Sequence, residues 1–180
     1  MISSEQTMSP ATPQPVDAPW IRSVVDQYEG PLVRYATRIL GDVERARDVA
    51  QDTFLRLCNQ SRSEVEGRLA EWLFTVCRNR ALDVRRKEER MRPMTEAAQA
   101  RPGRGPEPAQ ALMEKESSNR LFAALARLPK REQEILRLKF QEGLSYKEIS
   151  GVMQLTVSNV GWLIHTGLKT IQRELAADRP

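Results

Sequence analysis

The chain has 180 residues, of which 40% are hydrophobic and 29% are charged, and its formal net charge is +4. This length permits one or two small domains but no large buried core. The first nineteen residues hold no Lys, no Arg and no apolar run, which argues against a signal peptide or a membrane span and predicts a disordered tail over residues 1–19.

Few residues of the chain could bind a metal. Cys58 and Cys77 lie within helical hydrophobic patterns and lack the C-x-x-C spacing of zinc and redox sites, and His165 is the single histidine. We therefore expect a reduced, cytoplasmic protein with no disulfide, no metal and no cofactor.

The hydrophobic pattern divides the chain into two helical parts. Apolar residues recur every three to four positions in residues 20–92 and 112–180, without the alternation of strands, which predicts an all-α fold of two small domains. Residues 93–111 contain four prolines and two glycines and predict an extended, flexible linker. The excess of positive charge is concentrated in the stretches 68–92 and 112–180. Two separate basic surfaces are expected if both bind one polyanion, although so small an excess does not establish nucleic-acid binding by itself.

In the first domain, Gly30-Pro31 predicts a break between two helices, and Gly41-Asp42 is expected to end the second of them and cap the next. The helix that follows, over residues 43–60, is expected to bury residues at spacings of three and four. These are Val43, Ala46, Ala50, Phe54 and Leu57. Its outward face carries Asp48, Gln51, Asp52 and Leu55, which is either a partner surface or an ordinary solvated face with one leucine.

A third helix follows residues 61–67 and continues into a cationic stretch. Its expected core positions are Leu69, Trp72, Leu73, Val76 and Cys77. Its cations are Arg78, Arg80, Arg85, Arg86 and Lys87. Helical phase places Arg78 and Arg85 away from the core, Asn79 beside Arg86, and Asp83 near the buried stripe within reach of Arg80 and Lys87. The stretch is either a solvated helix end or a phosphate-binding surface, on which Asn79 offers a donor and an acceptor to a base edge.

The second domain has the pattern of a helix-turn-helix. Ser145 and Glu148 form a capping box for a short helix with Ile149 and Val152 inward, residues 153–155 form the turn, and Thr156 caps a longer helix to residue 175. The start of that helix would enter a major groove, with Val157, Ser158, Asn159 and Trp162 facing DNA. Positions expected to pack inward are Val160, Leu163, Ile164 and Leu168, while His165 is expected at the surface or on a phosphate.

Three stretches resemble bacterial sigma factors of the extracytoplasmic-function (ECF) group, which join sigma regions 2 and 4 by a linker. YATRILGDVERARDVAQDTFLRL is similar to a block with a D-x-x-Q-x-x-F core, matched by Asp48, Gln51 and Phe54. EWLFTVCRNRALDVRR is similar to a W-L-x-x-x-x-x-N-x-x-x-D-x-x-R block, and LPKREQEILRLKFQEGLSYKEIS resembles region 4. The likeness runs from Trp20 to Leu175.

The resemblance implies RNA polymerase core, promoter DNA and an anti-sigma factor as partners, and a role for each surface. Core binding falls on Asp48, Gln51, Asp52 and Leu55. Capture of the −10 element falls on the loop QSRSEVEG and the basic helix, as Ser61, Arg62, Ser63, Asn79, Arg80, Arg85 and Arg86. Binding of the −35 element falls on Val157, Ser158, Asn159, Trp162, His165, Lys169 and Arg173.

The recognition helix departs from the family pattern T-V-K-S-R-L-x-R-A-R. Its four basic positions are occupied by Gly161, Leu163, Thr166 and Leu168, which leaves Lys169 and Arg173 for backbone contacts. This departure puts the family's usual −35 contacts in doubt, but not the fold.

Three rival functions make different predictions. A response regulator would carry a receiver domain of alternating strands and helices, whereas residues 20–90 predict helices only. An RNA-binding antiterminator would need an aromatic platform in the basic segment. An enzyme would need a phosphate-binding glycine loop, a metal spacing or a nucleophile beside its base, and the sequence offers none of these.

Overall fold

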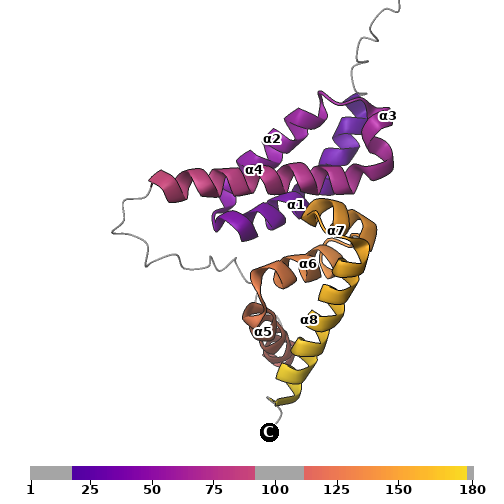
Figure 1. The fold of residues 1–180 in the computed structure, drawn as a ribbon. Helices are drawn as coiled ribbons and strands as arrows, with labels where there is room; N and C mark the ends of the chain where they lie inside the picture. The colour runs from indigo at the N-terminus through magenta and orange to yellow at the C-terminus, as the bar shows by residue number, and fades with distance from the viewer. Residues whose placement is uncertain (1–17, 92–111, 178–180) are drawn as a thin grey trace, which may run out of the picture.

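The computed structural model describes residues 18–91 and 112–177, and every regular element within those ranges is helical (Figure 1). The first domain comprises α1 (Ala18–Leu40), α2 (Val43–Leu57), α3 (Arg62–Val65), a 3-10 turn at Glu66–Arg68, and α4 (Leu69–Met91). The second comprises α5 (Leu112–Arg127), α6 (Lys130–Phe140), α7 (Tyr146–Met153) and α8 (Val157–Ala177). The all-α prediction is confirmed. The linker and most of the predicted tail lie outside the described residues, and residues 18 and 19 begin α1.

Helix α1 runs without interruption through Gly30-Pro31, so the predicted break is wrong. Proline disfavours a helical residue before it because its ring collides with the Cβ of that residue, and Gly30 has no Cβ. Pro31 still removes one backbone hydrogen bond. Burial on both sides of the proline offsets that loss, since Val24 and Leu32 are both in the core.

The start of α2 is capped as the sequence predicts. Gly41 has φ +75° and Asp42 accepts a 3.0 Å hydrogen bond from the Arg45 amide. The predicted core positions Ala46, Ala50, Phe54 and Leu57 are buried, but Val43 is 45% exposed. Because α2 packs against both α1 and α4, its buried face is wider than one stripe and includes Val49 and Thr53.

Helix α4 packs against both α1 and α2. Leu73, Phe74, Cys77 and Ala81 are buried along one face, and the Phe74 ring meets Tyr35 of α1 edge-on at 5.3 Å between centroids. Leu69, Trp72 and Val76 are only half-buried. The packed face continues through Val84, and Glu88 pairs with Arg45 of α2, before the end of the helix runs past its partners, as the magenta end in Figure 1 shows. Asp83 points away from the packed face. Asp83 is for that reason exposed and pairs with Arg86 at 3.2 Å, which corrects its predicted place beside the core.

The helix-turn-helix prediction is confirmed in the second domain. The Ser145 hydroxyl accepts from the Glu148 amide at 3.2 Å, and the Glu148 carboxylate accepts from the Ser145 amide at 2.7 Å. Thr156 likewise accepts from the Asn159 amide at 3.2 Å. One inward position differs: Gly167 is buried and Leu168 is 37% exposed. A Cβ on Gly167 would come within 3.1 Å of Leu136. The absence of a side chain at Gly167 therefore lets α8 approach α6 closely.

The turn between α7 and α8 holds a non-glycine residue in the left-handed region. Gln154 has φ 53° and ψ 51°, and its amide is within reach of the Ser150 and Gly151 carbonyls. A side chain in this region costs about 1 kcal/mol relative to glycine. We therefore expect Gln154→Gly to raise the free energy of unfolding by about 0.5–1 kcal/mol after the added freedom of the unfolded chain is counted.

Chemical denaturation of the purified chain would measure this change. Gln154→Ala keeps a Cβ and should bring no gain, which makes it the matched control. Equal stability of the glycine and alanine variants would show that the turn is not strained.

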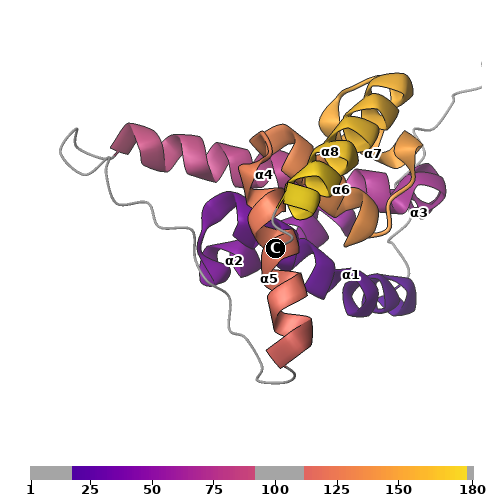
Figure 2. The same cartoon turned by 90° about the horizontal axis from the view of Figure 1, so that it is seen from below.

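The two domains pack against each other chiefly through α7, which lies across α4. Figures 1 and 2 show the second domain seated on one side of α4, with α8 on its outer side. This contact between the domains has no counterpart in the sequence-based predictions.

Candidate nucleic-acid and protein interfaces

The recognition helix α8 presents all seven residues that were predicted to face DNA. Val157, Ser158, Asn159, Trp162, His165, Lys169 and Arg173 are exposed, and most follow one another at three to four positions, so they lie along one side of the helix. Trp162 is 62% exposed, a large apolar surface for a monomer to leave in water. Lys169 and Arg173 are the cations of this helix. Its outer face therefore offers hydrogen bonds and apolar contact near its start and positive charge farther along.

The cations of α4 do not form one surface. Arg80 pairs with Asp52 of α2 at 3.1 Å, whereas Arg86 pairs with the exposed Asp83. Arg85 pairs with Glu89 at 3.5 Å and lines the space between the domains. Asn79 is exposed on the helix and is free to meet a ligand from solvent.

The segment before α4, predicted as a loop, forms the short helix α3 and a 3-10 turn. The Ser61 and Ser63 hydroxyls lie 2.8 Å apart. Arg62 pairs with Glu66 at 2.7 Å and stacks over the Trp20 ring at 5.4 Å. These contacts fix the segment against α1, so its side chains have defined positions.

The outward face of α2 agrees with the predicted surface at three of its four positions. Asp48 and Gln51 are exposed, and Leu55 is 59% exposed. Asp52 is instead partly buried and forms ion pairs with Arg56 at 3.3 Å and with Arg80 at 3.1 Å. It joins α2 to α4 within the domain, and the surface that remains is an apolar side chain beside acidic and amide groups.

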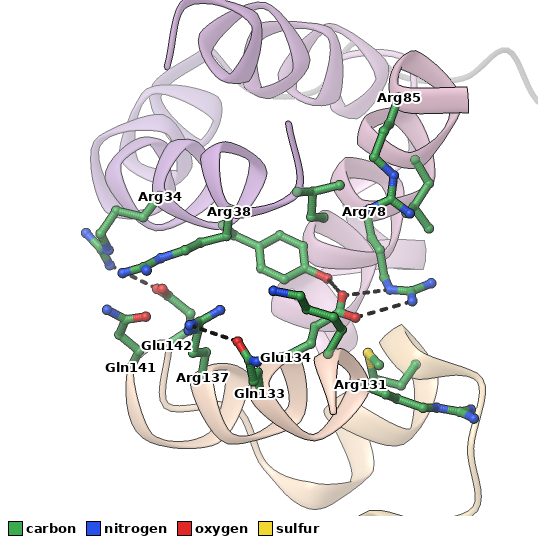
Figure 3. Close-up of a pocket in the computed structure, with 15 residues that line it drawn as sticks. Arg34, Arg38, Arg78, Arg85, Arg131, Gln133, Glu134, Arg137, Gln141 and Glu142 are labelled. Carbon is green, nitrogen blue, oxygen red and sulfur yellow. Dashed lines mark hydrogen bonds and ion pairs between the residues drawn. The ribbon is translucent and has the colours of Figure 1, made fainter. Parts of the chain in front are cut away.

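Glu134 of α6 is the centre of a polar contact between the domains. Its carboxylate accepts from Arg78 Nε at 2.9 Å and from the Tyr35 hydroxyl at 2.6 Å. Figure 3 shows the Arg78 side chain directed at Glu134. Burial, together with the charge of Glu134, raises the pKa of Tyr35 well above its usual value. Burial alone would lower the pKa of Arg78, but the hydrogen bond and charge of Glu134 raise it. A second pair joins Arg34 to Glu142 at 2.9 Å.

Sequence reasoning missed this contact. Arg34, Glu134 and Glu142 occupy positions that a helical pattern assigns to solvent, and such charges need no partner. Tyr35 is buried in the core, and a buried tyrosine hydroxyl requires an acceptor. The need for an acceptor was the single feature from which this contact between the domains could have been predicted, and it does not identify which residue is the acceptor.

Other site chemistry is missing from the part of the chain that the structure describes. Within it there is no cluster of metal-binding side chains, and no helix is long and apolar enough to cross a membrane. Cys58 is exposed and Cys77 is buried, and both are free thiols.

A two-domain helical protein with a helix-turn-helix and an exposed reading face belongs to the class of DNA-binding transcription proteins. Sequence comparison narrows that class. The sequence model of the family sigma-70 region 2 matches residues 24–91, and that of sigma-70 region 4 matches residues 118–171. Together they cover most of the chain, which therefore belongs to the sigma-70 family of RNA polymerase sigma factors, with relatives in its ECF group.

The ECF RNA polymerase sigma factor SigW of Bacillus subtilis is 25% identical over 162 residues, which are 84% of this chain and 87% of that protein. SigE of Mycolicibacterium smegmatis, also an ECF sigma factor, is 30% identical over 155 residues, 85% of this chain and 60% of that protein. The prediction of the family is confirmed, and the response-regulator alternative is not favoured.

Two solved structures share the fold. The sigma factor RpoE of Bartonella quintana, crystallised with the anti-sigma factor NepR, matches with a TM-score of 0.62 at 20% identity over 88% of this chain and 98% of that one. CnrH, in complex with the cytosolic domain of CnrY, matches with a TM-score of 0.61 at 20% identity, over 91% of this chain and 92% of that one.

Proposed function

We propose that this sigma factor attaches to RNA polymerase core through its first domain and reads the two promoter elements with separate domains. The domain of residues 20–92 binds core and the −10 element, and that of residues 112–180 binds the −35 element. The observation that supports this division best is that all seven predicted DNA contacts are exposed on α8. This helix follows a tight turn, and both helices of the motif are capped at their starts.

Core binding falls on the outward face of α2. Asp48, Gln51 and Leu55 are exposed there, and a large apolar side chain surrounded by polar groups is the usual centre of a protein interface. Asp52 contributes by holding α2 against α4 through Arg80.

Promoter opening falls on α3 and α4. Ser61, Arg62 and Ser63 flank the start of α4, and extruding a base requires a protein site that receives it. Asn79 reads a base edge, while Arg80, Arg85 and Arg86 hold phosphates. Arg85 lines the space between the domains in this structure, and its side chain is 49% exposed, so a phosphate can reach it from solvent.

The partners and location follow from the family. NepR and CnrY are bound to the two structural neighbours, and we infer that an anti-sigma factor also restrains this chain. The chain acts in the cytoplasm, where polymerase is, and it is not itself an enzyme, because catalysis belongs to the polymerase.

Two substitutions on α4 distinguish base reading from phosphate binding. Arg86→Gln should weaken promoter complexes at all sequences and reduce the slope of log affinity against log salt by about one, because each phosphate contact releases roughly one counterion. Asn79→Ala should instead lower discrimination among −10 sequences and leave the salt slope unchanged.

Open-complex assays with holoenzyme on a panel of −10 variants, each over a range of salt, would measure both effects. Arg120→Gln, which changes an exposed arginine on α5 of the second domain, is the control. An Asn79→Ala holoenzyme that keeps its sequence preference would contradict the base-reading role.

A further inference from the structure

A cleft of about 580 Å³ separates the two domains, with α1 and α4 on one side and α6 and α7 on the other (Figure 3). Seven Arg and Lys side chains line it, four from the first domain and three from the second, together with two carboxylates. The resulting excess of five positive charges is larger than the net charge of +4 of the whole chain. Positive charge is therefore concentrated in this cleft.

The two carboxylates are already used. Glu142 pairs with Arg34, and Glu134 pairs with Arg78 and accepts from Tyr35. Among the contacts of the described residues, four cations of the cleft have no acidic partner. They are Arg38, Lys130, Arg131 and Arg137.

Two of these cations approach one another from opposite domains. Figure 3 shows Arg38 from α1 and Arg137 from α6 directed into the same part of the cleft. Arg137 is half-buried, and its one hydrogen bond is a 3.4 Å contact to Gln133. Burial, followed by the charge of Arg38, lowers the pKa of Arg137. The charge of Glu134 acts in the opposite direction but does not outweigh these two effects, and a bound anion would oppose them further.

We propose that the cleft binds a phosphate-bearing small anion, either inorganic polyphosphate or the polyphosphate group of a nucleotide, which bridges Arg38 and Arg137 and holds the domains together. The planar donor fork of arginine matches phosphate oxygens in pairs. The volume lies within the range of about 300–1,000 Å³ that small-molecule sites occupy. A DNA duplex does not fit, because it would have to break the Glu134 and Glu142 contacts that close the cleft.

The site has a consequence for promoter binding. Arg85, assigned above to −10 phosphates, lines the same cleft. Arg85 can pair with a phosphate in the cleft or with a promoter phosphate but not with both, so the anion and the promoter compete for this side chain. Binding to the cleft itself does not depend on the proposed function.

Calorimetric titration of the full chain with tripolyphosphate and, separately, with ATP tests the proposal, with sodium chloride added to keep the ionic strength constant. One ligand should bind per chain. Arg38→Gln and Arg137→Gln should each weaken binding about tenfold, as expected for loss of one charge-assisted contact, and the double variant should not bind measurably. Arg47→Gln, outside the cleft, should bind as the unmodified chain does. Tighter binding of ATP would identify a nucleotide as the ligand, and tighter binding of tripolyphosphate would identify an inorganic anion.

A steric variant tests whether the site needs both domains. A Cβ on Gly151 of α7 would overlap the Glu71 carboxylate of α4, an overlap that the flexible Glu71 side chain can relieve by turning away. The larger side chain of Gly151→Leu adds further bulk between α7 and α4 and should push the domains apart while it keeps every cation of the cleft. Small-angle scattering should show the expansion, and the anion should bind at least about tenfold more weakly.

Three results would overturn the proposal. The first is equal binding by the double arginine variant and the unmodified chain. The second is undiminished binding by a Gly151→Leu chain that scattering shows to be expanded. The third is binding of an oligoglutamate peptide with the same arginine dependence while neither phosphate compound binds, which would assign the cleft to an acidic protein segment.

Discussion

Leu55→Glu is expected to weaken binding to RNA polymerase core by at least about tenfold, because loss of an apolar residue at the centre of an interface costs roughly 2 kcal/mol or more. Leu55 is 59% exposed on α2, so the folded chain loses little packing when it is replaced. A charge in its place must be desolvated when the complex forms. The substitution therefore acts on binding and not on folding.

Size-exclusion co-elution with core enzyme would measure the binding, and a helicity spectrum would verify the fold. Val43→Glu is the matched control, since Val43 is 45% exposed at the other end of the same helix. A glutamate there also lies favourably near the positive end of the helix dipole. Undiminished core binding by a folded double variant, Leu55→Glu with Gln51→Glu, would remove α2 from the interface.

Asn159→Ala should abolish much of the preference for one −35 sequence, by about 1–3 kcal/mol or roughly 5- to 150-fold in relative affinity, if its amide pairs with an adenine. Asn159 is exposed in the first turn of α8, where a recognition helix meets base edges. The four positions that usually hold cations are Gly161, Leu163, Thr166 and Leu168. Discrimination therefore rests on few side chains, and the loss of one is large.

Competition binding of holoenzyme to −35 variants would measure this preference. Gln172→Ala is the control, because Gln172 is an exposed amide on the same helix but far from its start. Trp162→Ala should also weaken binding, by removing apolar contact with sugar or a thymine methyl. An Asn159→Ala holoenzyme with an unaltered −35 preference would contradict the proposed readout.

Much of the fold follows from local sequence chemistry. The caps at Asp42, Ser145 and Thr156 each satisfy a backbone amide within three residues, so neighbouring residues alone predict them. The exposed face of α8 follows from helical periodicity in the same way. The function was predicted from the family resemblance. The residue patterns alone could not decide whether the cations of α4 bind phosphate or form a solvated helix end.

The predictions that were wrong depend on contacts distant in sequence. Pro31 stays helical because both halves of α1 share one core. Asp83 is exposed because the partners of α4 cover the face that carries Ala81 and Val84, and Gly167 takes the inward place of Leu168 because α6 comes close. The Glu134 contact joins two domains across an unpatterned linker, and neither periodicity nor capping carries information about such a pairing.

Mapping of transcript starts on a genomic DNA library tests the central claim most directly, with purified core enzyme compared in the presence and absence of this chain. The claim is that one chain recruits core and reads two promoter elements with two domains. It predicts new starts that share a −10 and a −35 sequence at a fixed spacing, and their loss with Leu55→Glu. The absence of new starts, or starts that share neither element, would contradict it.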